Sequence, residues 1–216
     1  MYKSVLHEMA STTPTQYWLD SCSQKELAYA LENGAVGATT NPLIVTAVLE
    51  SELPAYEQTI RNLLRDYPEA TEDDIAWKMI EHMAVQGART LEPIFAPSKG
   101  HGRISIQTNT KYHRSVPLLV EQATYFGTLA RNIQVKIPAT SAGIKALEEV
   151  TYRGISVNAT VSFTVAQAIA VAEAVERGLA RRAAEGLDNS AINPVCTIMG
   201  GRTDDFIKDL AAKRNI

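Results

Sequence analysis

Cysteine and aromatic residues are scarce in this sequence. Its 216 residues include two cysteines and 6% aromatic residues. Cys22 and Cys196 form no CxxC pair and no Cys/His ligand spacing, and the four histidines are scattered along the chain. We therefore expect two reduced cysteines and no zinc site or other bound metal.

Long apolar runs and runs of one charge are also missing. No stretch approaches the roughly 18 uninterrupted apolar residues of a membrane helix, and residues 1–8 lack the long apolar core of a signal peptide. The formal net charge is −3, without a run of lysine and arginine that could follow a nucleic-acid backbone. We expect a cytoplasmic protein that binds neither nucleic acid nor a membrane.

What the sequence has is the composition of an ordinary globular domain. Hydrophobic residues make up 45% of it and charged residues 21%. The length suits one domain with a sizeable core, and we expect residues 1–216 to form that single domain.

Short apolar or β-branched segments alternate with helical ones along the chain. We predict six strands, at residues 17–20, 36–40, 103–108, 133–137, 155–162 and 194–199. Ser23 with Glu26 and Thr164 with Gln167 each predict a capping box at the start of a helix. Residues 43–98 contain no clear strand, and we interpret them as a helical insertion after the second strand.

This alternation predicts a parallel sheet covered by helices, which either a doubly wound sheet or a (β/α)8 barrel would satisfy. Two features favour the barrel. No glycine-rich dinucleotide loop follows the first strand. In addition, polar residues lie within strands or at their carboxyl ends, where barrel active sites are built. These residues are Asp20, Asn41, Gln107, Lys136, Asn158 and Thr160.

Lys136 and Asp20 are the residues with the most evident chemical potential. A lysine inside a barrel loses water, which lowers the pKa of an amine and lets it attack a carbonyl. The simpler alternative is a lysine at a strand edge whose amine reaches solvent. Asp20 could accept a proton from a substrate hydroxyl, or it could merely cap the next helix. Asn158 and Thr160 are two residues apart and share one face of their strand.

Three segments resemble the transaldolase family of class I aldolases, which includes the related fructose-6-phosphate aldolases. They are residues 37–42 (GATTNP), 135–140 (VKIPAT) and 154–160 (GISVNAT). A fourth, residues 197–202 (TIMGGR), resembles the family's phosphate-facing segment.

The resemblance implies a (β/α)8 barrel, a mechanism and a set of site residues. Lys136 would form a Schiff base with a ketose phosphate, and Asp20 would deprotonate the hydroxyl whose collapse cleaves the carbon–carbon bond. No metal or organic cofactor is implied. Asn41 and Asn158 would hold substrate hydroxyls, and Thr160 and Gln107 would position a catalytic water. Thr197 and Arg202 would complete the substrate site, with Arg202 on the phosphate.

The departures from the family pattern keep three functions open. Many transaldolases have glutamate where Gln107 stands, whereas fructose-6-phosphate aldolases have glutamine, which can hold a water but cannot act as a base. Met199 replaces a residue that is often aromatic. The insertion and Asn158 favour a transaldolase, which transfers dihydroxyacetone between sugar phosphates of the pentose phosphate pathway. The alternatives are an aldolase without transfer and an inactive, truncated barrel with a structural or assembly role.

Six predicted strands are two fewer than a closed barrel of this type contains. The family's second phosphate-binding arginine also has no counterpart. We therefore expect a C-terminally truncated barrel whose partners are sugar phosphates, and a homo-oligomer is possible.

Overall fold

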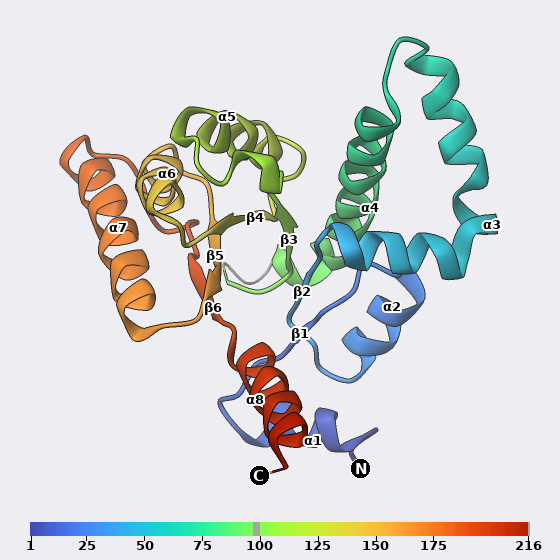
Figure 1. The fold of residues 1–216 in the computed structure, drawn as a ribbon, viewed down its shortest axis with the longest axis horizontal. Helices are drawn as coiled ribbons and strands as arrows, with labels where there is room; N and C mark the ends of the chain where they lie inside the picture. The colour runs from blue at the N-terminus through green and yellow to red at the C-terminus, as the bar shows by residue number, and fades with distance from the viewer. Residues whose placement is uncertain (97–99, 216) are drawn as a thin grey trace. The chain divides into compact units, whose positions relative to one another are not determined.

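Strands and helices alternate through most of the computed structural model, which describes residues 1–96 and 100–215 (Figure 1). The strands are β1 (Trp18–Leu19), β2 (Gly37–Thr39), β3 (Arg103–Gln107), β4 (Ile133–Pro138), β5 (Val157–Ser162) and β6 (Val195–Ile198). The helices are α1 (Val5–Thr12), α2 (Gln24–Glu32), α3 (Pro42–Asp66), α4 (Glu72–Phe95), the 3₁₀ helix η1 (Thr110–Tyr112), α5 (Val116–Gly127), α6 (Ser141–Tyr152), α7 (Val165–Ala184) and α8 (Gly200–Arg214).

The strands form a parallel sheet in which their order follows the chain, β1 to β6. All six predicted strands are present, and the predicted strand–helix alternation is confirmed. Six parallel strands with intervening helices make up part of a (β/α)8 barrel, which has eight. In the described part of the chain, no helix combines the length and the apolar content needed to span a membrane.

Contacts divide the chain into two compact units. The first comprises Met1–Gln107 and Phe126–Gln134, and it contains β1 to β3 with α1 to α4. Ala38 and Ile104 are fully buried, and Ile104 packs against Gly87 of α4. Since successive strand residues point to opposite faces, the residues on either side of Ala38 and Ile104 face away from that helix.

The predicted helical insertion is a pair of long helices, α3 and α4. The backbone of α3 departs from helical geometry at Glu52 (φ −121°, ψ 22°), two residues before Pro54, because proline cannot donate the helical hydrogen bond. The Glu52 carboxylate accepts a hydrogen bond from Ser23 at 2.6 Å. Thr71 and Asp74 form a reciprocal capping box at the start of α4. Residues 97 and 98 of the predicted insertion lie outside the described residues.

The second unit comprises Thr108–Tyr125 and Val135–Ile216, and it contains most of α5 and of β4, together with α6, α7, α8, β5 and β6. Val135, Ile137, Val157 and Ala159 are fully buried. They alternate with polar residues along β4 and β5, which is the pattern of a strand with an apolar face against helices. In this unit α6 and α7 lie side by side (Figure 1), and α8 has no buried residue.

Local details differ from the sequence prediction. The N-terminal helix α1, which we did not predict, begins after Ser4, whose hydroxyl accepts the His7 N–H and donates to Asn33. Pro93 lies inside the last turn of α4, where it cannot donate the helical hydrogen bond to the carbonyl four residues earlier. Ser23 caps α2 by accepting the Glu26 N–H, as predicted. The reciprocal half of the predicted capping box is absent, because the Ser23 N–H donates to the Ser21 hydroxyl at 3.1 Å. The Thr164–Gln167 capping box is confirmed.

The burial of His82 on α4 leads us to predict that the folded protein loses stability in mild acid. Burial, and secondarily the charge of Arg89, lowers the pKa of His82 below its ordinary value of 6.5. Its Nε2 atom is buried and has no hydrogen-bond partner among the described residues. The unfolded chain therefore takes up the proton at a higher pH than the folded chain, and stability decreases as pH falls below about 6.5.

Urea unfolding at about pH 7.5 and about pH 5.5 measures this loss. We expect His82→Gln to be less sensitive to acid than the wild type. The exposed His113 supplies the control variant, His113→Gln, which should keep the wild-type loss. Equal acid sensitivity of the wild type and His82→Gln would show that another group is responsible.

Candidate functional site

In the second unit, Lys136 is a buried residue in the middle of β4. Its exposed fraction is 7%, and its neighbours Val135 and Ile137 are fully buried. β4 pairs with β5 in register, and Lys136 lies opposite Asn158. Lys136 is therefore not the edge lysine with a solvated amine that the simpler interpretation of the sequence would require.

Asn158 and Thr197 place further polar groups on the same face as Lys136. Asn158 is 3% exposed, and the Thr197 hydroxyl donates a hydrogen bond of 2.8 Å to its Oδ1. Thr197 lies two residues beyond Val195, which is the register partner of Asn158 on β6. Adjacent residues in register point to the same face of a sheet, so this unit brings together an amine, an amide and a hydroxyl.

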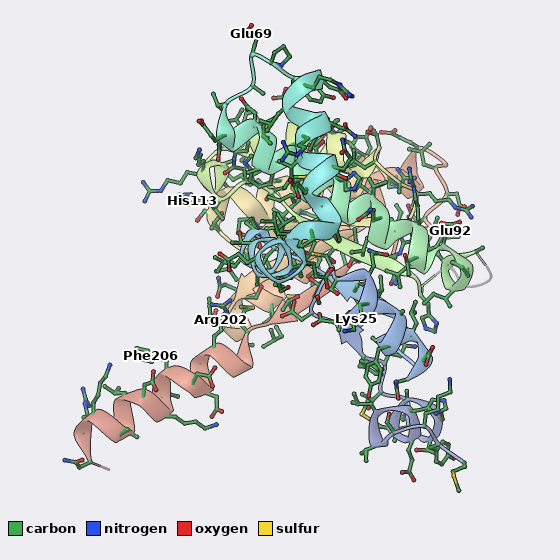
Figure 2. The ribbon with its side chains drawn as sticks, turned by 90° about the vertical axis from the view of Figure 1, so that its right-hand side faces the viewer. Lys25, Glu69, Glu92, His113, Arg202 and Phe206 are labelled. Atoms are coloured by element: carbon green, nitrogen blue, oxygen red, sulfur yellow. The ribbon has the colours of Figure 1, made fainter. Side chains whose placement is uncertain are left out.

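Thr160 and Arg202 occupy different surroundings in the second unit. Thr160 lies two residues after Asn158 on the same face of β5, is 7% exposed, and is the register partner of Pro138. Arg202 is exposed in the first turn of α8, which Figure 2 shows extending away from the strands of this unit. Its guanidinium can therefore meet a charged ligand from solvent.

In the first unit, Asp20, Asn41 and Gln107 lie at or beyond the carboxyl ends of β1, β2 and β3. Because the three strands are parallel, these ends meet at one edge of the sheet. Leu19, Ala38 and Ile104 are paired in register and point to one face of the sheet. Each polar residue lies an odd number of positions after one of them, and side chains alternate between the two faces, so the polar residues point to the opposite face.

The contacts of Asn41 and Asp20 refine their predicted roles. The Asn41 Oδ1 atom accepts the N–H of Ile44 at 3.0 Å and caps α3, so its amide N–H groups are the part available to a substrate oxygen. Asp20 is exposed, and the residue that caps the following helix is Ser23. The alternative interpretation of Asp20 as a helix cap is therefore wrong, and its carboxylate remains accessible.

Two polar contacts on strands β3 and β4 or next to them were not predicted from the sequence. The Ser105 hydroxyl donates to Gln134 Oε1 at 3.1 Å within the first unit, and both residues are fully buried. In the second unit, Thr108 donates two hydrogen bonds to the Lys136 carbonyl. Side chains alternate along a strand, so the position of Gln134 two residues before Lys136 in the sequence was a sign that it shares a face with the lysine. Nothing in the sequence indicated the partner of Thr108.

The second unit has the elements of a nucleophilic site. A primary amine that is nearly dry can add to a carbonyl carbon, and neighbouring amide and hydroxyl groups can orient the oxygens of the carbonyl compound. Within residues 1–96 and 100–215, no three His, Cys, Asp or Glu side chains gather as a metal site would require.

Comparison with known proteins finds one matching family and several relatives. Residues 17–215 match the family described as transaldolase/fructose-6-phosphate aldolase. The chain is 30% identical over 215 residues to transaldolase 1 of Streptomyces avermitilis, covering 95% of this chain and 56% of that protein. It is 32% identical over 203 residues to a transaldolase of Thiobacillus denitrificans, covering 88% of this chain and 55% of that protein. The chain thus spans about half the length of these curated relatives.

Proposed function

The chain belongs to the transaldolase/fructose-6-phosphate aldolase family, and we propose that Lys136 is the Schiff-base lysine of a transaldolase centre. The observation that carries the proposal is the burial of Lys136 opposite Asn158, which is itself held by Thr197. A buried amine beside fixed polar groups suits attack on a ketone.

The proposed reaction begins with addition of the Lys136 amine to the ketone of a ketose phosphate and loss of water, which gives an iminium. Asp20 accepts the proton of the hydroxyl at the carbon to be released. The bond to that carbon then breaks, its electrons enter the iminium, and an aldose phosphate leaves. The dihydroxyacetone enamine that remains on Lys136 adds to the aldehyde of a second aldose phosphate, and water releases the new ketose phosphate.

The other site residues bind and orient the reactants in this proposal. Asn158 and the Asn41 amide hold hydroxyl groups of the sugar, and Gln107 and Thr160 hold the water needed for hydrolysis. Arg202 binds the substrate phosphate, because a guanidinium matches phosphate in charge and in hydrogen-bonding geometry. Arg202 is exposed, which supports binding of a phosphate group that stays partly hydrated.

Transfer and simple cleavage are the two candidate activities. The relatives described above carry the name transaldolase, which supports transfer to an aldose phosphate. Gln107 favours the second candidate, a fructose-6-phosphate-type aldolase, because the resemblance associates glutamine at this position with that activity. The enamine is common to both reactions, and only its fate differs.

An acceptor test distinguishes the two activities. The 216-residue chain is incubated with fructose 6-phosphate, with or without erythrose 4-phosphate, and release of glyceraldehyde 3-phosphate is followed. We expect the acceptor to raise the rate by about tenfold or more, since it removes the enamine. Equal rates with and without acceptor would support the aldolase, and no release by a folded chain would contradict both activities.

A further inference from the structure

Thr108 makes two hydrogen bonds to one atom of the residue proposed as the nucleophile. It follows the last residue of β3 and is 2% exposed. Its backbone N–H donates to the Lys136 carbonyl at 3.0 Å, and its side-chain hydroxyl donates to the same oxygen at 3.1 Å. All of these atoms belong to the second unit.

The second of these bonds is additional to the pairing of a parallel sheet. The backbone N–H bond is of the kind that neighbouring parallel strands exchange. A carbonyl oxygen has two lone pairs, and the Thr108 hydroxyl uses the other one. Threonine is stiff at χ1, so a buried hydroxyl in this position holds the peptide that follows Lys136 from a fixed direction.

The segment that carries Thr108 is anchored on its other side as well. The next residue, Asn109, donates its N–H to Gln122 Oε1 on α5 at 2.7 Å, and its side chain accepts the Lys111 N–H at 2.9 Å. Thr108 therefore ties the Lys136 peptide to a segment that is itself held by α5.

We propose that Thr108 is a positioning residue for Lys136, and that its hydroxyl fixes the peptide from which the lysine side chain projects toward the substrate ketone. This inference rests on the proposed function of Lys136. The reacting atoms of an addition must approach to within about 3–3.5 Å in alignment, and small displacements of a catalytic group are costly. The hydroxyl should therefore act on the rate of addition and much less on substrate affinity.

The test compares Thr108→Val, which keeps the shape of the side chain without the donor, with Thr108→Ser, which keeps the donor. The measured quantity is the rate of irreversible labelling of Lys136 by fructose 6-phosphate and borohydride, as a function of substrate concentration. We expect Thr108→Val to lower the maximal rate by about tenfold, with the half-saturating concentration changed less than about twofold. Thr108→Ser should recover most of the rate.

Thr151 provides a matched control in the same unit. Its hydroxyl is buried on α6, is fully shielded from solvent and has no partner among the described residues. Thr151→Val therefore makes the same chemical change in a buried position without removing a hydrogen bond, and it should label at the wild-type rate. Circular dichroism establishes that each variant is folded, and Thr108→Ala replaces Thr108→Val if the valine variant is not.

The outcomes separate the inference from the proposed function. A wild-type maximal rate in folded Thr108→Val or Thr108→Ala would overturn the positioning role and leave Lys136 as the nucleophile. A serine variant as slow as the valine variant would also overturn it, because the hydroxyl would then not be the group that matters. A folded wild-type chain that is never labelled would overturn the proposed function and, with it, the role assigned to Thr108.

Discussion

Lys136→Met should lower the rate of dihydroxyacetone transfer by about a thousandfold or more, because it removes the amine that we propose forms the covalent intermediate. Methionine is similar to lysine in length and suits a position that is 7% exposed, so the variant should fold. The measurement is kcat/KM for fructose 6-phosphate with erythrose 4-phosphate as the acceptor. Asn158 and Thr197 remain in place in this variant, so any residual rate reports substrate binding without covalent catalysis.

The control for this variant is Lys145→Met. Lys145 is an exposed residue of α6, nine positions further along the chain. Its replacement should leave kcat/KM within about twofold of the wild-type value, as expected for a surface change remote from the chemistry. A Lys136→Met enzyme that keeps a tenth of the wild-type rate or more would show that the amine of Lys136 is not the nucleophile.

Gly143→Ala should destabilise the fold by about 3 kcal/mol or more. Gly143 is in the first turn of α6, where its N–H donates a hydrogen bond of 3.0 Å to the side-chain oxygen of the N-cap residue Thr140. A Cβ atom built on Gly143 would overlap the carbonyl of Pro138, the last residue of β4. A backbone carbonyl cannot move aside as a flexible side chain can, so the turn between β4 and α6 must open. Urea unfolding of the 216-residue chain measures the change.

Gly201→Ala is the matched control for this substitution. Gly201 is also in the first turn of a helix, and a Cβ atom there meets nothing within 4 Å. Alanine is the better helix former, so we expect stability to be unchanged or to rise by up to about 1 kcal/mol. Equal urea midpoints for Gly143→Ala and the wild type would show that the close approach at Pro138 is not required.

The regular part of the fold was predictable from the sequence because each signal was local. Apolar segments of strand length gave β3, β4 and β5, and Thr164 with Gln167 gave the start of α7. The period of two placed Asn158 and Thr160 on one face of β5, in agreement with the register between β4 and β5. The three motifs gave the family, which the match over residues 17–215 confirms.

Contacts between distant residues could not be predicted in the same way. The bond from Thr197 to Asn158 joins residues 39 positions apart, and the bond from Thr108 to Lys136 joins residues 28 apart. Neither depends on a local pattern, because each arises when two strands are paired in a particular register. Helix α1 was missed for a related reason, since Ser4 is also fixed by a distant residue, Asn33. The roles of all eight site residues stay predictions: Asp20, Asn41, Gln107, Lys136, Asn158, Thr160, Thr197 and Arg202.

The most direct test of the account is to find where a substrate carbon becomes attached. The wild-type chain and Lys136→Ala are incubated with fructose 6-phosphate and borohydride, followed by intact mass and peptide mapping. We predict a mass gain equal to one reduced dihydroxyacetone unit in the wild type, located in the peptide that contains Lys136 and absent from the variant. A folded wild-type chain without this gain, or with the gain at another lysine, would contradict Lys136 as the Schiff-base residue.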